Sequence, residues 1–476
     1  MQKKDKFRNY QQIREAHWDK VAQSLEHWKG WGGYYRSRLQ KIYGFTIPQG
    51  MDILEIGCAR GDLLASLNPQ KGVGIDLSGA MIKQATNRHP NLTFIQGDIH
   101  EIDPDEKLDY IILSDLINDL WDVEAVFHTI HQMCKPSTRI ILNYYNRLWE
   151  WPLAVAQKLH LAQPTLPQNW LSEEDVRNLL YLGGFEVIRD WEEMLAPLPF
   201  PILSGLCNHF LVRLWPFRSL AMTAFTLARV IPLQDKKEYS VSVVVPARNE
   251  EGNIKSIFER VPPMGESTEL IFVEGHSKDN TYTVIEEEMR NHPKVNASLY
   301  RQAGKGKGDA VRMGFAHASG DILMILDADL TVPPEDLPRF YHAIQSGKGD
   351  FINGVRLVYP MEKQAMRFFN YIGNKAFSML FSFLLDQPLK DTLCGTKVLR
   401  KADYDRIALN RSYFGDFDPF GDYDLLFGAA KLNLKIVDLP IRYEERIYGT
   451  TNIQRWKHGW LLLKMVVFAA RRIKFI

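Results

Sequence analysis

The sequence has little net charge, few cysteines and no long apolar run. Lys and Arg number 58 and Asp and Glu 57, so the net charge of +1 gives no global reason to expect nucleic-acid binding. The four cysteines are far apart and form neither a CxxC pair nor a cluster with histidines, which argues against a disulfide framework or a zinc site. These absences predict a protein of a reducing, cytoplasmic compartment without a nucleic-acid partner.

The hydropathy of the sequence also predicts neither a membrane-spanning helix nor a secretory signal. The first twenty residues are charged and polar where a signal peptide needs an apolar core, so we do not expect secretion. The two most apolar stretches, 194–233 and 456–476, are interrupted by Arg, Lys or His and fall short of the ~20 apolar residues of a spanning helix. Either stretch could lie on a membrane surface instead.

Length and hydrophobic rhythm indicate two α/β domains. A chain of 476 residues, 45% of them hydrophobic, is long enough for more than one core. Short apolar runs alternate with helical patterns over 52–142 and again from 241 onward, which is typical of parallel sheets. Between them lies an apolar, proline-containing stretch. We predict a first domain over 1–195, a connecting segment over 196–238, a second domain over 239–455 and a basic amphipathic helix over 456–476.

The first domain carries a glycine turn and acidic residues at strand ends. LEIGCARGDLL, residues 54–64, places Gly57 and Gly61 between a strand and a helix, where glycine lets the backbone approach a ligand. Asp76 ends the strand GVGID, where a carboxylate can accept bonds from two ribose hydroxyls, and Asp98 follows the strand TFIQG. Together these features predict a nucleoside-cofactor site. A Rossmann dehydrogenase is the rival, but its GxGxxG is absent.

With these motifs, residues 35–195 resemble a class I S-adenosylmethionine-dependent methyltransferase, whose sheet is Rossmann-like. The resemblance implies that Asp76 binds the cofactor's ribose. It also implies cofactor contacts from Glu55, Gly57 and Gly61 to the methionine portion, from Asp98 and Ile99 to the adenine, and from Ser114 and Asp115 on the methyl-transfer side. Ala59 stands where the family often has glycine, so the alternative is that this half is a non-catalytic binding or scaffold module.

The methyl acceptor is less well defined. A hydroxyl acceptor would need a general base, for which Asp119, His128 and His131 are titratable candidates, whereas a carboxylate acceptor would need none. Packing or surface roles compete with catalysis for both histidines. Downstream, Ser172 before acidic residues and Gly183 after an apolar pattern predict a capped helix that closes the domain.

The second domain carries a different set of motifs. VSVVVPARNEEGNI, residues 241–254, is a buried strand that runs directly into a helix start, which suits a nucleotide. In LDADL, Asp327 and Asp329 end an apolar strand with one residue between them, and such a pair can hold Mg²⁺ or Mn²⁺ against a pyrophosphate. Lys305, in the preceding glycine-lysine loop, could meet phosphates.

Together these motifs make residues 240–455 resemble a family-2 glycosyltransferase of the GT-A fold, most closely the polyprenol-phosphate synthases of the dolichol-phosphate mannose type. The resemblance implies an inverting enzyme with a nucleotide-sugar donor and a glycan or polyprenol-phosphate acceptor. It assigns nucleotide-sugar binding to Pro246, Arg248, Asn249, Glu250, Glu274, Lys305 and Asp327, metal binding to Asp327 and Asp329, and catalysis to these two together with Asp422 and Asp424. Asp422 is the candidate base for a hydroxyl acceptor.

Two departures from that family pattern concern specificity. VEGHS, residues 273–277, replaces the usual VDDGS, which leaves open which nucleotide the sugar donor carries. The phosphate-binding GxSK becomes Gly449 to Asn452 without its lysine, although Arg442, Arg446 and Arg455 could supply the charge.

The C-terminal stretch concentrates positive charge. From Arg442 onward, eight Lys or Arg face two Glu, while Trp456, Trp460, Leu463 and Val467 recur at helical spacing. This pattern is typical of a helix lying on an anionic membrane surface, and the alternative is a helix that packs its tryptophans on the domain. We therefore expect a cytoplasmic, bifunctional enzyme attached peripherally to the inner face of a membrane. The alternative is a glycosyltransferase alone, with the first half non-catalytic.

Overall fold

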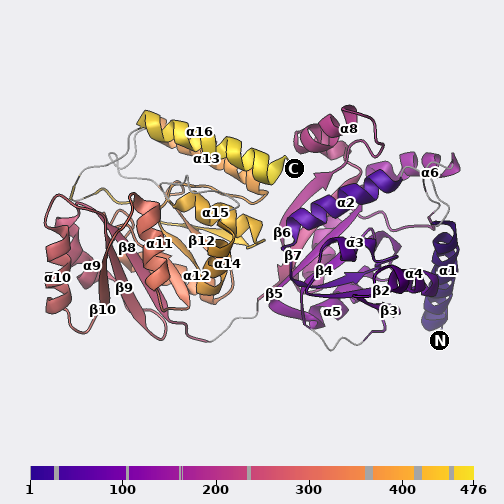
Figure 1. The fold of residues 1–476 in the computed structure, drawn as a ribbon, viewed down its shortest axis with the longest axis horizontal. Coiled ribbons are helices and arrows are strands. Elements are labelled where there is room, and N and C mark those ends of the chain that lie inside the picture. Colours follow the sequence, from indigo (N-terminus) through magenta and orange to yellow (C-terminus); the bar gives the residue numbers. More distant parts are fainter. Residues whose placement is uncertain are drawn as a thin grey trace. The chain divides into compact units, whose positions relative to one another are not determined.

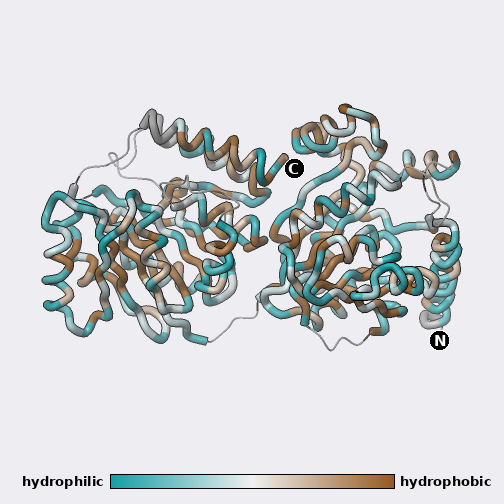
Figure 2. Tube along the Cα trace, viewed as in Figure 1, coloured by the Kyte–Doolittle hydropathy of each residue, from teal (hydrophilic) through white to brown (hydrophobic). Residues whose placement is uncertain are grey.

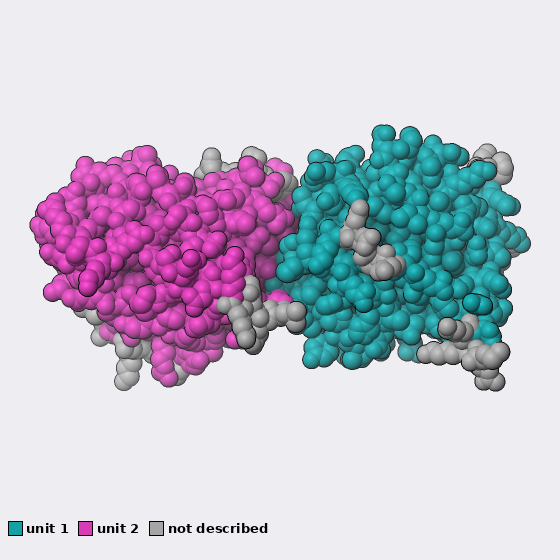
Figure 3. All heavy atoms as spheres, turned by 90° about the horizontal axis from the view of Figure 1, so that it is seen from below, with its two compact units in different colours: residues 1–231, 475 teal, residues 232–474, 476 magenta. Residues whose placement is uncertain are grey.

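The computed structural model describes residues 2–25, 32–102, 107–159, 162, 165–232, 237–359, 368–411, 421–446, 448–449 and 455–475. The chain divides into two compact units, which Figure 3 draws in different colours. Unit 1 contains residues 1–231 and 475, and unit 2 contains residues 232–474 and 476. Each unit is built around a seven-stranded sheet of its own (Figure 1).

The sheet of unit 1 has the strand order β3-β2-β1-β4-β5-β7-β6. Its strands are β1 (Asp52–Ile56), β2 (Lys71–Asp76), β3 (Thr93–Gln96), β4 (Leu108–Ser114), β5 (Cys134–Tyr145), β6 (Phe185–Glu193) and β7 (Thr223–Val230). The first five run parallel, and β7 lies antiparallel between β5 and β6. The predicted Rossmann-like α/β sheet is therefore present.

Helices cover both faces of this sheet because successive strand residues point to opposite sides. Leu54 of β1 faces the core under α5 and α7, whereas Ile53 faces the core under α2 and α3. The helices of unit 1 are α1 (Gln2–Leu25), α2 (Gly32–Thr46), α3 (Asp62–Ser66), α4 (Gly79–Arg88), α5 (Val123–Gln132), α6 (Glu150–Lys158), α7 (Glu173–Leu182) and α8 (Leu203–Gly205). The carboxyl ends of the parallel strands thereby meet at one edge, where the predicted motifs lie.

The stretch predicted to connect the domains belongs largely to unit 1. Residues 196–238 include β7, which pairs with β5 from Arg139 to Tyr145 and with β6 along its length. Because TAFTLARV is buried on both sides, with Phe225 and Leu227 fully covered, it is a core strand and not a linker. The boundary between the units falls after Ile231.

The sheet of unit 2 has the order β10-β9-β8-β11-β13-β12-β14. Its strands are β8 (Val241–Ala247), β9 (Thr268–Glu274), β10 (Asn296–Arg301), β11 (Ile322–Ile325), β12 (Phe351–Val355), β13 (Lys397–Arg400) and β14 (Ile436–Pro440). Strands β10, β9, β8 and β11 are parallel, and β13 is antiparallel to both of its neighbours. β12 and β14 are parallel to each other. This sheet agrees with the second α/β domain predicted from the sequence.

Helices also cover both faces of the second sheet. Alternating residues of β8 divide between two cores, with Val244 packed under α11 and Val243 packed under α9 and α12. The helices of unit 2 are α9 (Ile254–Arg260), α10 (Thr281–Asn291), α11 (Lys307–His317), α12 (Leu337–Gln345), α13 (Phe368–Leu385), α14 (Lys401–Leu409), α15 (Asp422–Lys431) and α16 (Arg455–Ala469).

The C-terminal helix α16 lies beside α13 on unit 2 (Figure 1). It buries Leu462, Met465 and Ala469 in the core of the unit, while Trp460 and Leu463 on another face stay exposed. The side chains of Trp456 and Lys457 lie outside the described residues. Among the helices that the structure describes, none combines the length and apolarity needed to cross a membrane.

Candidate active sites

The glycine turn of unit 1 is built from residues in the left-handed region. Gly57 has a φ of 75° and Gly61, which precedes α3, a φ of 70°. A Cβ on Gly61 would lie 2.4 Å from the ring of Phe94, so both conformation and space favour glycine there. Ala59 also has a positive φ, 46°. The turn therefore keeps its left-handed conformation with alanine in place of the glycine that the family often has.

Asp76 ties this turn to the end of β2. Its carboxylate accepts hydrogen bonds from the backbone N–H of Ala59 at 2.8 Å and from that of Ser78 at 2.9 Å. Burial raises the pKa of Asp76 to about 6 despite these two bonds. Both Asp76 and Gly57 line the same cavity. The carboxylate thus stands at the position from which the sequence predicts ribose binding.

Glu55 lies under the turn and is buried. Its Oε2 accepts a hydrogen bond from the backbone N–H of Leu64 at 3.0 Å. Burial raises the pKa of Glu55 to about 8, opposed by this hydrogen bond. Glu55 therefore braces the first turn of α3 and also reaches the cavity wall.

The adenine end of the predicted site is lined by Asp98 and Ile99 and is covered by α1. Gln11 of α1 donates a hydrogen bond to Asp98 Oδ2 at 2.7 Å, and His100 lies against Oδ1. Hydrogen bonds from His100 and Gln11 hold the pKa of Asp98 below its usual value against the effect of burial. Residues of α1, including Tyr10, also line the cavity. The sequence motifs gave no indication that α1 takes part.

At the methyl-transfer end, Asp115 is held by side chains from two other elements. Tyr35 of α2 donates to its carboxylate, with O···O distances of 2.7 and 2.9 Å, and Asn143 of β5 donates to Oδ1. Burial raises the pKa of Asp115 to about 6. Ser114 and Tyr145 line the same part of the cavity, and the ring of Tyr145 stacks on that of Tyr35.

The structure places the three candidate bases, Asp119, His128 and His131, in different surroundings. Asp119 lines the cavity, but its carboxylate forms an ion pair with Arg14 at 2.9 Å and accepts a hydrogen bond from Trp18 at 2.8 Å, which fixes α1. His128 is exposed on α5, and the ring of His131 packs against Phe185. The carboxylate of Asp119 is thus engaged by α1, as that of Asp115 is by Tyr35 and Asn143.

The cavity of unit 1 has a volume of about 980 Å³. One end is formed by the glycine turn and the acidic strand ends described above. The other end is mostly apolar. Its walls include Leu153 and Ala154 of α6, Leu166 from the stretch between α6 and α7, and Pro197 and Leu198 from the segment after β6. Its volume lies at the upper end of the usual ~300–1,000 Å³ of ligand sites, so there is room for a second substrate.

In unit 2, the end of β8 forms a polar turn against the end of β9. Asn249, with a φ of 57°, donates its backbone N–H to Ser277 and accepts from the backbone N–H of Lys278 at 2.7 Å. Glu274 is buried and accepts from the backbone N–H of Ser277. Pro246 is the penultimate residue of β8 and pairs in register with Val273. The predicted nucleotide-binding residues of these two strand ends therefore lie together.

Three carboxylates and two cations meet next to this turn. Lys307 Nζ lies 2.6 Å from Asp327 Oδ1. Arg446 bridges the other two carboxylates, at 3.0 Å from Glu250 Oε1 and 2.5 Å from Asp329 Oδ2. Burial raises the pKa of Glu250 to about 7, opposed by Arg446. The charge of the aspartate pair is thus balanced by cations of the chain itself.

Space at this cluster is limited by Gly395 of the DTLCGTKVLR segment. A Cβ there would lie 1.9 Å from Asp327 Oδ2 and 2.3 Å from Lys307 Nζ. Glycine is therefore required for Asp327 and Lys307 to meet. The neighbouring Asp391 forms a buried pair with Arg356 at 2.7 Å, which fixes the start of the same segment.

Lys307 was not singled out in the sequence, although it lies in the loop GKGDA. Asp309 organises that loop, accepting from the backbone N–H of Gly304 at 3.0 Å and from Gln302 at 2.9 Å. Lys305 is exposed on the loop, and Lys307 is the lysine that reaches Asp327.

The two aspartates of the predicted acceptor motif start α15. Asp424 is nearly buried and accepts from Arg411 Nε at 2.8 Å. The side chain of Asp422 lies outside the described residues, as do Thr450, Thr451 and Asn452. Within the parts that are described, no cluster of three or more His, Cys, Asp or Glu side chains has metal-binding geometry.

Comparison with known proteins matches each unit to a transferase. Residues 242–407 match the model of glycosyl transferase family 2, and residues 27–190 match that of a methyltransferase domain. The dolichol-phosphate mannosyltransferase of Pyrococcus furiosus is 30% identical over 247 residues, which cover 49% of this chain and 67% of that protein.

Solved methyltransferase structures align with part of the chain. The S-adenosylmethionine-dependent methyltransferase of Mesorhizobium loti is 16% identical, with a TM-score of 0.31 over 40% of this chain and 96% of that one. The N-methyltransferase NodS of Bradyrhizobium japonicum, in complex with S-adenosyl-L-homocysteine, is 14% identical, with a TM-score of 0.30 over 42% and 88%. Likeness at this level says nothing about the acceptor.

The fold, the two strand-end sites and the matches define an enzyme with two transferase domains. The chain belongs to glycosyl transferase family 2 through its C-terminal half and carries a methyltransferase domain in its N-terminal half.

Proposed function

We propose that the chain is a bifunctional enzyme of one glycan pathway. Unit 2 transfers a sugar from a nucleotide-sugar donor to a glycan or polyprenol-phosphate acceptor with inversion, and unit 1 methylates a molecule of the same pathway with S-adenosyl-L-methionine. The observation that carries the proposal is that each unit has a polar cluster at the carboxyl ends of its parallel strands.

For unit 1, the proposal gives each cofactor-contacting residue a role. Glu55, Gly57 and Gly61 would surround the methionine portion, Asp76 would bind the ribose, and Asp98 and Ile99 would frame the adenine. All of these residues except Gly61 line the cavity, and Gly61 precedes α3 in the same turn. Asp115, whose pKa is raised to about 6, would accept a proton from a hydroxyl acceptor at neutral pH. Ser114 would line the same end.

For unit 2, Asp327 and Asp329 would hold Mg²⁺ or Mn²⁺ together with the diphosphate of the donor. Two carboxylates suit this ion, because Mg²⁺ in such sites takes one or two protein carboxylates and completes its shell with phosphates and water. When bound, the metal would neutralise charge on the leaving nucleotide. Lys307 and Arg446 would then be available to the phosphate oxygens as the metal takes over the carboxylates.

The remaining residues of unit 2 would bind the nucleotide and the acceptor. Pro246, Arg248, Asn249, Glu250, Glu274 and Lys305 are the proposed nucleotide-sugar contacts. Asp422 would act as base for a sugar hydroxyl, with Asp424 supporting it from the first turn of α15. A phosphate acceptor is already an anion and would need no base.

Peripheral attachment of a cytoplasmic protein to an anionic membrane surface is part of the proposal. The relative from Pyrococcus furiosus is named for a dolichol-phosphate substrate, which is a lipid. In α16, Trp460 is 61% exposed, and Leu463 and Val467 are exposed on the same helix. These features favour a helix that turns Trp460 to the membrane surface over one that packs Trp460 on the domain.

Isothermal titration calorimetry tests the proposal. The full chain is titrated with S-adenosyl-L-homocysteine and then with UDP and GDP sugars in Mg²⁺ or Mn²⁺. Binding of both ligand classes at independent sites is expected. The titrations with UDP and GDP sugars identify the nucleotide of the donor. Binding of a nucleotide sugar alone would reduce the function to glycosyl transfer, and binding of neither would contradict both activities.

A further inference from the structure

In the segment that follows β6 in unit 1, residues 195–213, apolar side chains are exposed and polar side chains are buried. Ile202 is 90% exposed, and Leu203 and Leu206 are about half exposed. In the same turns, Ser204 and Asn208 are buried. In a water-facing segment the apolar side chains are the ones expected inside. Figure 2 shows brown, hydrophobic stretches in the turns around α8, where these residues lie.

The buried polar residues show that this reversal is fixed by specific contacts. The side-chain oxygen of Asn208 accepts from the backbone N–H groups of Leu195 and Ala196, at 2.8 and 2.9 Å, and its amide donates to Ala196 and to Tyr34 of α2. Ser204 donates to the carbonyl of Leu198. All hydrogen-bonding positions of the Asn208 amide are used, so the segment cannot turn its leucines inward without breaking them.

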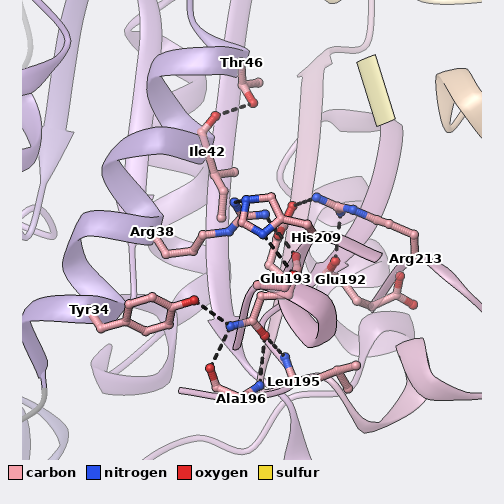
Figure 4. Close-up of polar contacts among 12 residues, drawn as sticks. Tyr34, Arg38, Ile42, Thr46, Glu192, Glu193, Leu195, Ala196, His209 and Arg213 are labelled. Carbon is pink, nitrogen blue, oxygen red and sulfur yellow. Dashed lines mark hydrogen bonds and ion pairs between the residues drawn. The ribbon is translucent and has the colours of Figure 1, made fainter. Parts of the chain in front are cut away.

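A buried charge cluster anchors the same segment to the sheet. Glu193, at the end of β6, pairs with Arg38 of α2 at 3.2 Å and with Arg213. Arg38 also donates to the carbonyl of Asn208 at 3.1 Å. Figure 4 shows the side chains of Arg38, Glu193 and Arg213 converging beneath the segment. Anchoring of this kind holds exposed apolar side chains in place instead of letting them collapse.

Helix α6 extends the apolar surface next to this segment. Just before this helix, Trp149 Nε1 donates to the carbonyl of Leu220 at 2.9 Å, and the backbone N–H of Asn146 donates to the carbonyl of Met222. Trp151, 80% exposed, and Val155 then point outward from α6. We call the resulting surface the apolar face, represented by Trp151, Val155, Ile202, Leu203, Trp215 and Leu220, all exposed.

Charge and side-chain type distinguish a lipid surface from a protein partner. Residues 194–222 contain no Asp or Glu. The exposed cations Arg147, just before α6, and Lys158, at its end, flank a single acid, Glu150. Trp215 is 82% exposed, and tryptophan is the side chain enriched where an apolar surface meets lipid headgroups.

We propose that the apolar face of unit 1 docks on an anionic lipid bilayer and presents the methyl-transfer cavity to lipid-linked acceptors. The inner side of the same elements lines the apolar end of the cavity, through Leu153 and Ala154 of α6 and through Leu198. A substrate anchored in the bilayer therefore reaches that end along apolar walls. The acceptor part of this inference rests on the proposed methyltransferase function, whereas the docking part does not.

Site-specific fluorescence tests the docking. Single cysteines replace Trp151 or Leu203 in the full chain, with Cys207→Ser to remove the one native cysteine that is not buried, and carry an environment-sensitive dye. Vesicles of phosphatidylglycerol and phosphatidylcholine are expected to shift both emissions to the blue. The matched control is the dye at Tyr181→Cys, which is 68% exposed on α7 of the same unit and should not respond.

Charge substitution gives a second measurement. Trp151→Glu with Leu203→Glu should lower the partition coefficient on the same vesicles by roughly tenfold or more, because charge opposes insertion at both positions. Leu409→Glu, at a position 83% exposed in unit 2, should leave it unchanged. The proposal is contradicted if the Trp151→Glu, Leu203→Glu double variant lowers the partition coefficient no more than Leu409→Glu does.

Other outcomes are equally decisive. Dyes at 151 and 203 that stay unshifted while the protein co-sediments with vesicles would place the docking elsewhere and overturn the inference. A blue shift that grows with protein concentration without vesicles would make the face a contact between copies of the chain, and would overturn it too. Loss of S-adenosyl-L-homocysteine binding with the dye response retained would instead contradict the proposed methyltransferase, leaving the docking intact.

Discussion

Buried carboxylates at the first site make the stability of unit 1 depend on pH. Burial raises the pKa of Glu55 from 4.5 to about 8, so over this window the folded state holds a proton that the unfolded chain has lost. Stability then falls as pH rises through the window. Glu55→Gln removes the ionisation and keeps an acceptor for Leu64. In the absence of ligand, its melting temperature relative to wild type should increase from pH 5 to pH 8, by about 2 °C or more.

Thermal unfolding at pH 5 and pH 8, monitored through a signal from unit 1, measures this difference in melting temperature. Glu174→Gln, at an exposed position on α7, serves as the matched control and should show the same pH dependence as wild type. Equal pH dependence in Glu55→Gln and wild type would mean that the carboxyl group of Glu55 is solvated in the folded protein.

Two lysines of one loop offer a sharp comparison at the second site. Lys307 lies 2.6 Å from Asp327, whereas Lys305 is exposed. Lys307→Met should weaken nucleotide-sugar binding by roughly tenfold or more, since a charge-assisted hydrogen bond is worth about 1.5–3 kcal/mol. Lys305→Met should have the smaller effect. Calorimetric titration with Mg²⁺ present measures both, and the reverse order would favour the role predicted for Lys305 from the sequence.

The sequence could predict the site residues that follow strands directly, and it missed the contacts that residues from other elements make to them. Asp76 ends β2 and Asp327 follows closely on the apolar strand β11, so their position at the sheet edge follows from the local pattern. Tyr35 reaches Asp115 from a helix 80 positions away in the chain, and Arg446 reaches Asp329 from 117 positions away. No local spacing encodes such contacts, because they depend on how helices and loops pack.

The buried charge cluster under residues 195–213 is expected to control that segment. Arg213→Met leaves Glu193 buried with Arg38 as its remaining partner. Removing one member of a buried pair costs about 3–5 kcal/mol, so the segment should loosen and unit 1 should melt at a lower temperature. Limited proteolysis within 195–213, together with the melting temperature, measures both effects.

Arg218→Met is the matched control for this substitution. Arg218 pairs with Glu192 at 3.2 Å but is half exposed, so its loss should cost no more than about 1 kcal/mol. Equal effects of the two substitutions would mean that the buried cluster does not anchor the segment.

Elements with a clear local signature could be predicted, and β7 could not. Ser172 caps α7 in a capping box, and Gly183 ends that helix, as the pattern indicated. The eight residues of β7 follow an apolar, proline-containing stretch, and their strand character comes from pairing with β5 and β6. Because that pairing is non-local, residues 196–238 were predicted to be a connecting segment.

The two sheets share no strand, so each site is expected to stabilise its own unit. In differential scanning calorimetry, S-adenosyl-L-homocysteine should raise one unfolding transition, and a nucleotide sugar with Mg²⁺ should raise the other. Ligand at 100 times its Kd adds about 2.7 kcal/mol, enough for a shift of several degrees. A single transition that moves with either ligand would show that the units unfold together.

The position of β7 also has a consequence for synthesis of the chain on the ribosome. β6 is made before β7 yet joins the sheet only through it, since β7 lies between β5 and β6. The methyltransferase match ends at residue 190, before β7 begins. A gene cut at that point would yield a strand with no neighbour to pair with, and during translation unit 1 must wait for residue 230 before its sheet can close.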